Sequence, residues 1–517
     1  MPGHVLAAMA LMLPWLNPIA AGPTPSVLPW LVSAACVAGL CALAAHADIR
    51  WTATIRASWL WAALISSVLG LLQYFDLSAA LEGWVNHPAS GVAYGNLRQR
   101  NQFATLLNLG LVALVCVVLR RHPAQAQGGR WPMAHRGGML GIAVATVLLA
   151  SANAASVSRT GALQLAGILL MGGLWSWWSN PQVRRMLLLA VLAYGVASVT
   201  LPWLAGRDPF SSGITGRFGI EAPGCESRLV LWSNVLHLIG LRPWTGWGWG
   251  ELDYAHFMTV YPGARFCDIL DNAHNLPLHV AVEFGVPAAA VLCALVVWLL
   301  WRNRPWRETG VERQMAWAVL GLIGVHSMLE YPLWYGPFQI ALGACVWMLC
   351  CGRAHDATSD VQPSHGSGPA AMSRAWRGSL TALALVIALS VAYATWDYHR
   401  ISQIYLRPEQ RSPAYRDDTL AKVQDSWLFR RQVRFAELTL AQVDQDNAAR
   451  LNAMARRLLH FSPEPRVIEK LIDTARMLGQ DDEARSLARR FAIAFPQDHA
   501  RWVQRAAAGS LDAPGRP

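Results

Sequence analysis

The sequence predicts an all-α, polytopic membrane protein of about eleven transmembrane helices with a helical tail at its C-terminal end. Composition is the first observation: 54% of the 517 residues are hydrophobic and only 15% are charged, whereas a soluble domain is nearer a quarter charged. The second is a series of apolar runs that approach the ~20 residues of a spanning helix. The third is a change, after the last of these runs, to a charged sequence with apolar residues three and four positions apart.

The apolar runs place the spans in order along the chain. The first run lacks a charged leading region and a small-residue cleavage site, so it is read as a retained span and not as a signal peptide. The expected spans are 4–20, 25–45, 53–75, 101–119, 138–155, 160–178, 186–204, 276–301, 314–330, 335–351 and 377–396.

The arginines set the orientation of these spans. Most of them gather in alternate short loops and therefore on one face, which the positive-inside rule makes cytoplasmic, together with the N-terminus. The formal charge of +11 thus indicates orientation and does not indicate nucleic-acid binding. The opposite face receives the segment 76–100, the long polar loop 206–275 and the tail from Asp397. In a bacterium that face is periplasmic, and the chain is expected in the inner membrane.

Four regions follow from this reading. Residues 1–351 form a transmembrane core that includes the loop 206–275, and residues 352–376 form a cytoplasmic linker rich in Pro, Gly and Ser. Residues 377–396 form the last span, and residues 397–517 form a periplasmic helical tail. The apolar spacing in the tail fits a tetratricopeptide-like repeat or a plain helical bundle, and either one is typical of an interaction module.

Two polar features lie on the outer face. Arg159 follows Ser158 between two spans with almost no loop, so its guanidinium lies at the membrane surface, where a lipid diphosphate is the obvious anion for a bidentate fork. Cys225 and Cys267 are the two cysteines of the outer loop, whereas the others fall in or at the ends of spans. Two cysteines in an oxidising compartment predict a disulfide.

The most unusual stretch runs from Asp271 to Gly285, where the polar loop meets an apolar run. His274 is flanked by Asn272 and Asn275 at the expected membrane surface. Ionisable groups in such places are functional candidates, because burying them without a partner costs several kcal/mol. A helix-capping Asn beside a solvated His is the alternative. A metal site is disfavoured, because the spacing of Asp268, Asp271, His274 and His279 does not place them on one helical face.

Several motifs together resemble the PglL-type bacterial protein O-oligosaccharyltransferases, which share a superfamily with O-antigen ligases and Wzy-type polymerases. Each motif is weak alone, but their order and spacing are specific, and the resemblance runs from about residue 14 to the tail. One departure is the first outer turn, where the family often has a His and this chain has Ile19-Ala20. The motifs are Gly95-Asn-Leu-Arg-Gln-Arg-Asn-Gln-Phe-Ala-Thr105, Ser158-Arg-Thr-Gly161, Ser227-Arg228 with Trp232, Pro243-Trp-Thr-Gly-Trp-Gly-Trp-Gly250, Asn272-Ala-His-Asn275 and His326-Ser-Met-Leu-Glu-Tyr-Pro-Leu-Trp-Tyr335.

The resemblance implies transfer of a glycan from undecaprenyl diphosphate to an acceptor hydroxyl, without a metal or another cofactor. His274 is then the candidate base. If Asn272 or Asn275 caps the following helix, the helix N-terminus favours the neutral imidazole. Arg159 and Arg228 are the candidate ligands of the diphosphate. Gln99, Asn101, Glu330 and Tyr331 join the two asparagines as supporting residues, and we expect Glu330 to pair with Arg159 or Arg228. Trp244, Trp247 and Trp249 fit either sugar platforms or interfacial anchors.

The expected partners are the undecaprenyl-diphosphate-linked glycan, membrane lipids and a periplasmic acceptor protein, such as a pilin, that docks on the tail. An O-antigen ligase with lipid A core as acceptor is the first alternative, and a Wzy-type polymerase is less favoured. A transporter of the lipid-linked glycan would show internal repeats and helices broken at mid-membrane, which the sequence does not suggest. No Gly-rich phosphate loop follows a strand, so a nucleotide-sugar donor is not expected.

Overall fold

The structure, a computed structural model, describes residues 2–20, 22–86, 91–121, 133–213, 224–356 and 373–511. Every regular element among these described residues is a helix, which confirms the all-α prediction. Most of the predicted linker, residues 357–372, lies outside the described residues.

Each predicted span falls on a helix, with ends shifted by a few residues. Among the described residues, seven helices are long and apolar enough to cross a membrane, which supports a multi-pass membrane protein. These seven are α2, α3, α4, α5, α7, α13 and α16. The helices on which the predicted spans fall are α1 (Pro2–Leu16), α2 (Val27–His46), α3 (Trp51–Tyr74), α4 (Arg100–Arg120), α5 (Met133–Ala155), α6 (Arg159–Leu174), α7 (Pro181–Leu204), α13 (Val286–Asn303), α14 (Val311–Ser327), α15 (Gly336–Asp356) and α16 (Arg374–Ser402).

The predicted span at 276–301 is wrong in one respect, because the structure divides it into two helices. The short helix α12 (Leu276–Phe284) ends at Gly285, whose φ is +89°, and α13 begins at the next residue. A Cβ at Gly285 would lie 2.3 Å from the carbonyl oxygen of Trp244, so a loop distant in sequence packs against the chain at this point. Apolar periodicity cannot report such a contact, and α13 alone is the candidate span.

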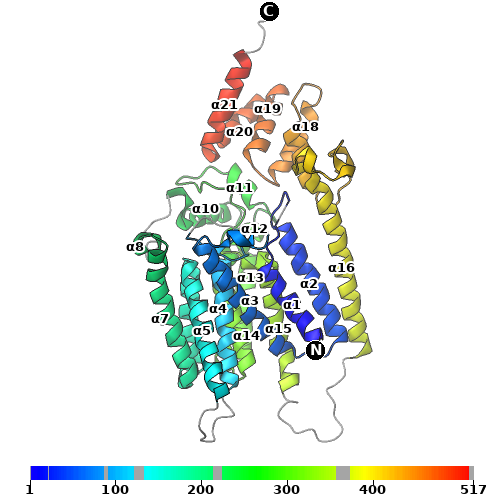
Figure 1. Cartoon of the computed structure of the whole chain (residues 1–517). Coiled ribbons are helices and arrows are strands. Elements are labelled where there is room, and N and C mark those ends of the chain that lie inside the picture. Colours follow the sequence, from blue (N-terminus) through cyan, green and yellow to red (C-terminus); the bar gives the residue numbers. More distant parts are fainter. Residues whose placement is uncertain are drawn as a thin grey trace, which may run out of the picture. The chain divides into compact units, whose positions relative to one another are not determined.

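Two compact units make up the chain. The first contains residues 1–220 and 299–393. Helix α4 lies in its middle, with 89% of its apolar window buried, and Figure 1 shows α3, α4 and α5 side by side. Small residues permit this close packing: a Cβ at Gly70 of α3 would lie only 2.4 Å from Cζ of Phe103 in α4.

The second unit contains residues 221–298 and 394–517. It joins the helices of the loop, α10 (Arg228–Leu241), α11 (Leu252–Met258) and α12, to the helices of the tail. Phe257 of α11 is buried in the hydrophobic core of the tail, His460 Nδ1 lies 2.7 Å from Glu251 Oε2, and Arg490 Nε donates to the carbonyl of Met258 at 3.0 Å. The sequence-based boundaries at 351, 376 and 396 remain predictions.

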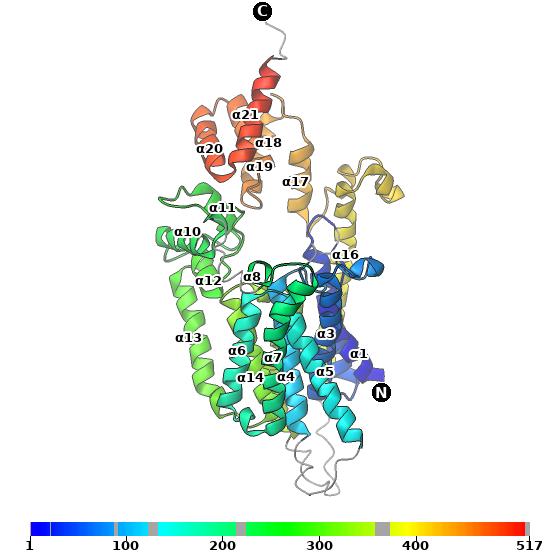
Figure 2. The same cartoon turned by 60° about the vertical axis from the view of Figure 1, so that its left-hand side comes forward.

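The tail consists of helices that each pack on the next one in sequence, as Figure 2 shows for α18 to α21. The apolar stripes predicted from spacing face this core: Leu451, Leu458, Leu471 and Phe491 are all buried. The helices are α17 (Arg430–Leu440), α18 (Ala448–Leu459), α19 (Pro465–Met477), α20 (Asp481–Ala494) and α21 (Pro496–Leu511).

The glycine-rich loop 243–250 packs directly on α12. The backbone N–H of Trp247 donates to the carbonyl of Val282 at 2.9 Å, and that of Gly248 donates to the carbonyl of Glu283 at 2.9 Å. Gly246 has a φ of +66°, and a Cβ there would lie 2.3 Å from the carbonyl carbon of Glu283. Only glycine permits this approach, so the loop fixes the C-terminal end of α12.

A buried histidine holds the next part of the loop. His256 Nδ1 lies 2.8 Å from the Tyr261 hydroxyl, and Nε2 lies 3.1 Å from the carbonyl oxygen of Phe266. Burial lowers the pKa of His256 from 6.5 to about 3, and the charge of Arg265 lowers it further. The neutral ring therefore donates from Nε2 to Phe266 and accepts from Tyr261.

We expect Gly246→Ala to destabilise the second unit by more than about 1 kcal/mol, because the new Cβ meets the backbone of α12 at a left-handed position. Gly263→Ala is the matched control, because a Cβ at Gly263 meets no atom within 4 Å. Thermal unfolding of the two purified variants measures the difference, and equal melting temperatures would contradict this packing.

We also expect stability to fall on acidification. Because the folded pKa of His256 is depressed, its contribution is complete above the unfolded value of 6.5 and is lost as pH falls toward about 3. The loss amounts to up to about 1.4 kcal/mol per pH unit. Melting temperatures recorded across this range should fall less steeply for His256→Gln than for the wild type, whereas replacing the exposed His399 by Gln should leave the wild-type profile. Identical profiles for wild type and His256→Gln would refute the role of His256.

Candidate functional site

His274 lies in a tight turn that precedes α12. Its φ is +50°, a left-handed conformation that costs a residue with a Cβ roughly 1–2 kcal/mol. Asn272 compensates, because its Oδ1 accepts a hydrogen bond from the backbone N–H of His274 at 2.9 Å. Asn275 is the N-cap of α12, with its Oδ1 accepting from the N–H of Leu278 at 3.1 Å. The predicted asparagine cap is thus present, and the two asparagines aim the imidazole from a defined backbone.

His279 supports this turn from the inside of the second unit. Its Nδ1 accepts from the backbone N–H of Ala273 at 3.4 Å, and its Nε2 lies 3.6 Å from Glu283 Oε2. Burial lowers the pKa of His279 to about 4, with a further contribution from His274. A neutral ring is consistent with Nδ1 acting as an acceptor. Glu283 in turn accepts from the N–H of Gly250 at 2.8 Å, which connects the turn to the glycine-rich loop.

The sequence analysis treated His279 only as a possible metal ligand. In the structure its ring is buried and supports the His274 turn through Ala273. Among the described residues, no group of three or more His, Cys, Asp or Glu side chains has the geometry of a metal site. The i, i+4 spacing of His279 and Glu283 was the sequence signal that could have revealed their pairing.

Asp253 in α11 is a second residue that sequence reasoning missed. Desolvation raises the pKa of its carboxyl to about 7, and the nearby charges of Glu251 and Asp271 raise it further. A carboxyl that titrates near neutral pH is a functional candidate. Nothing in the local pattern marks Asp253, because the main cause of the raised pKa is burial in the folded loop.

Arg228 belongs to the same unit as His274 and is the first residue of α10. Ser227 caps this helix, with its Oγ accepting from the N–H groups of Leu229 and Val230 at 3.2 and 3.3 Å. One turn after Arg228, Trp232 donates from Nε1 to the carbonyl of Ala273 at 3.1 Å. Residues four apart share a helix face, so Arg228 lies on the face of α10 that contacts the His274 turn.

The disulfide between Cys225 and Cys267 is present, with the two Cα atoms 5.4 Å apart. It matches the pairing predicted from the sequence. Cys225 lies three residues before Arg228, and Cys267 lies seven residues before His274. The bond therefore joins the two chain segments that carry these candidate residues.

Arg159 belongs to the first unit, where it is the exposed first residue of α6. Ser158 caps the helix by accepting from the N–H of Gly161 at 3.0 Å. The Ser158 hydroxyl donates to Asn101 Oδ1 at 2.6 Å, and Asn101 Nδ2 donates to Glu330 Oε1 at 3.0 Å. These buried hydrogen bonds fix the end of α6 that carries Arg159.

The remaining predicted supporting residues, Gln99 and Tyr331, lie close in sequence to Asn101 and Glu330. Gln99 is the N-cap of α4, with its side chain accepting from the N–H of Gln102 at 2.6 Å. Tyr331 stacks on Tyr335, with ring centroids 5.9 Å apart. For Glu330 we expected an arginine, and the structure gives it a hydrogen bond from Asn101.

Polar side chains continue inward from Asn101 along α4. The Thr105 hydroxyl lies 3.0 Å from His326 Nδ1 and 3.1 Å from Gln164 Oε1, and Asn108 Nδ2 donates to the carbonyl of Gly161 at 3.1 Å. All are buried. The sequence analysis assigned no role to His326, Gln164 or Asn108, although polar residues inside apolar helices were the available signal.

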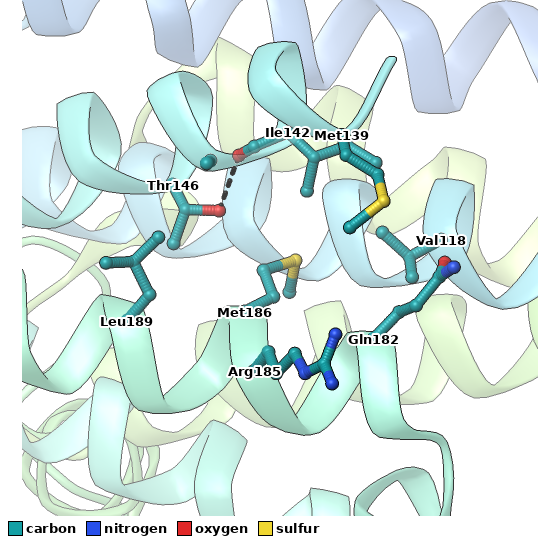
Figure 3. Close-up of a pocket in the computed structure, with 9 residues that line it drawn as sticks. Val118, Met139, Ile142, Thr146, Gln182, Arg185, Met186 and Leu189 are labelled. Carbon is teal, nitrogen blue, oxygen red and sulfur yellow. Dashed lines mark hydrogen bonds between the residues drawn. The ribbon is translucent and has the colours of Figure 1, made fainter. Parts of the chain in front are cut away.

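The candidate residues thus divide between the two units. The first carries Gln99, Asn101, Arg159, Glu330 and Tyr331, and the second carries Arg228, Asn272, His274 and Asn275. A pocket of about 110 Å³ in the first unit is lined by none of them. Figure 3 shows its mainly apolar wall, contributed by α4, α5 and α7, with Arg185 and Gln182 at one side.

We expect Glu330→Ala to lower stability by about 1–3 kcal/mol, because the buried amide of Asn101 loses its acceptor. Glu330→Gln keeps an acceptor oxygen at this position and should retain most of the wild-type stability. Thermal unfolding in one detergent measures both variants. If Glu330→Ala has the stability of the wild type, the hydrogen bond between Asn101 and Glu330 does not stabilise the fold.

Three family models match separate parts of the chain. The model described as protein glycosylation ligase matches residues 93–115, which include Gln99 and Asn101. The model described as O-antigen ligase matches residues 144–293, which include Arg159, Arg228 and His274. The model described as virulence factor membrane-bound polymerase, C-terminal, matches residues 314–508.

Two relatives from Acinetobacter baylyi give the same indication. The chain is 25% identical over 291 residues to a general O-oligosaccharyltransferase, covering 54% of this chain and 47% of the relative. It is 22% identical over 254 residues to a ComP-specific O-oligosaccharyltransferase, covering 49% and 43%. The chain therefore spans somewhat less than half the length of these relatives. By these matches the chain is similar to the bacterial protein O-oligosaccharyltransferases of PglL type and, over residues 144–293, to the O-antigen ligases.

Proposed function

We propose that the protein transfers a glycan from undecaprenyl diphosphate to Ser or Thr hydroxyls of periplasmic proteins. The observation that carries the proposal is the His274 turn, in which the imidazole is presented by a left-handed residue between two asparagines that each hold a backbone N–H. Such a conformation costs a residue with a Cβ roughly 1–2 kcal/mol, and strained backbone of this kind clusters at functional sites. The matched O-antigen ligase model, which includes this turn, supports the same assignment.

In the proposed step, His274 acts as general base. The acceptor hydroxyl oxygen attacks the anomeric carbon of the first sugar while its proton passes to the imidazole. The bond between that carbon and the diphosphate oxygen breaks, and the diphosphate leaves with the electron pair. Asn275 caps α12 directly after His274, so the backbone that carries the imidazole is fixed to the N-terminal end of this helix.

Arg159 and Arg228 bind the diphosphate and offset the charge that develops on it. Each is the first residue of a helix whose N-terminal N–H groups are capped by a serine, and each has the planar fork that suits phosphate oxygens. Gln99, Asn101, Glu330 and Tyr331 are the proposed supporting residues of the first unit, and Asn272 and Asn275 are those of the second. The mechanism requires no metal and no other cofactor.

The location of the chemistry follows from the arginine pattern. With the arginine-rich loops in the cytoplasm, the chain resides in the bacterial inner membrane and the His274 turn faces the periplasm. The helical tail supplies a docking surface for the acceptor protein, which a pilin would suit. Both relatives are O-oligosaccharyltransferases, and this likeness supports a protein acceptor.

An O-antigen ligase is the alternative, because the longest match before the tail is to a model of that name. In this alternative the acceptor is a sugar of the lipid A core, and the roles of His274 and the arginines stay the same. A Wzy-type polymerase, whose acceptor is another lipid-linked glycan, is favoured less.

We expect His274→Ala to reduce glycan transfer by about 100- to 10,000-fold, the usual contribution of a general base. The assay is the mass of a candidate pilin in cells that make an undecaprenyl-linked glycan. His399→Ala, which replaces an exposed histidine of the same unit, is the control and should leave transfer unchanged.

The acceptor in this assay separates the functions. A His274-dependent mass shift of the pilin supports the protein transferase, whereas His274-dependent modification of lipid A core instead would favour the ligase. Normal transfer by His274→Ala, with the protein present at wild-type level, would reject His274 as the base.

A further inference from the structure

Helix α10 has one buried face and one exposed apolar face. Leu231, Val235 and Leu238 are buried against α11 and α12. Leu229 and Leu236 lie seven residues apart, which is about two turns of a helix, and their side chains are 77% and 56% exposed. The exposed face therefore carries leucines where a water-facing helix would carry polar groups.

The apolar exposure continues into the glycine-rich loop. Trp244 is 78% and Trp249 is 73% exposed, and Trp249 lies against the half-exposed Phe284 with ring centroids 5.7 Å apart. Trp247 differs, because its Nε1 donates to the carbonyl of Leu238 at 2.9 Å and Arg242 lies over its ring. The sequence could not separate these three tryptophans, but the structure gives Trp247 a packing role and leaves the other two exposed.

The same loop is tied to the start of a membrane span. The backbone N–H of Val286, the first residue of α13, donates to the carbonyl of Pro243 at 2.7 Å, and Gly285 packs against the backbone of Trp244. The candidate span Val286–Arg307 is only 6% buried along its apolar window, so its side chains face lipid. Figure 2 shows α12 leading directly into α13. Trp244 and Phe284 therefore lie at the boundary where lipid begins.

We propose that a surface composed of Leu229, Leu236, Trp244, Trp249 and Phe284 lies in the membrane interface and contacts lipid. We call it the α10 surface. Its occupant is the boundary between headgroups and acyl chains, because two of its residues, Trp244 and Phe284, adjoin the first residues of the exposed, apolar helix α13. Tryptophan prefers this boundary, and helices with one apolar face lie flat in it. Arg228, next to Leu229, is then close to the phosphates of the headgroups.

This contact sets the depth of the His274 turn. Helix α12 has nine residues, and at 1.5 Å per residue it is about 14 Å long. His274 lies two residues before its first residue and Phe284 is its last, so the imidazole turn lies no more than about 20 Å from the lipid boundary. That distance matters to the proposed function, because the diphosphate there belongs to a lipid. The contact between the α10 surface and lipid is argued from exposure and packing alone.

The test places a nitroxide spin label on the α10 surface of the full chain in liposomes. The label is attached to Leu236→Cys, in a background where the cysteines outside the Cys225–Cys267 disulfide are alanine. Ala264→Cys, at an exposed position on another part of the same loop, is the control. Power saturation compares collisions with oxygen, which concentrates in lipid, and with a water-soluble nickel complex.

We expect the oxygen-to-nickel collision ratio to be several-fold higher at position 236 than at position 264. Equal ratios would place the α10 surface in water and overturn the proposal. Low collision with both reagents at position 236 would mean that protein covers the surface, which also overturns it. The measurement does not depend on catalysis, so its failure would leave the glycan-transfer proposal intact, and an inactive His274→Ala variant would give the same ratio.

Discussion

The backbone at His274 is the constraint on which the rest of the second unit depends. A left-handed histidine is stable only if its neighbours hold it, and three hydrogen bonds do so: from His274 to Asn272, from Leu278 to Asn275, and from Ala273 to His279. Each partner is fixed in turn by burial or by the helix that it begins. These bonds fix the backbone of the turn, as the proposed role of His274 as base would require.

The elements around the His274 turn hold helix α12 in place. The glycine-rich loop fixes one end of α12 through Gly246, and Gly250 binds the carboxylate of Glu283. Glu251, the next residue, contacts His460 of the tail. The tail thus belongs to the same compact unit as the His274 turn. A partner that binds the tail would act on the structure that carries the candidate base, and not on an independent module.

The sequence predicted the helical class, helices at the apolar runs, the tail stripes and the disulfide, because these depend on local periodicity and on counting cysteines. It failed where distant segments meet. The break at Gly285 depends on Trp244, and the inward position of His279 depends on Ala273 and Glu283. The pKa of Asp253 has the same origin. None of these contacts leaves a pattern within one segment.

Replacement of Asn272 tests most directly whether a fixed turn positions His274. Asn272→Ala removes the acceptor for the His274 N–H, and Asn272→Ser restores a weaker one. With a lipid-linked donor and a pilin, kcat should fall about tenfold in the alanine variant, equivalent to about 1.4 kcal/mol, and recover partly in the serine variant, while KM for the donor stays unchanged. Wild-type kcat in a folded Asn272→Ala protein would contradict the account.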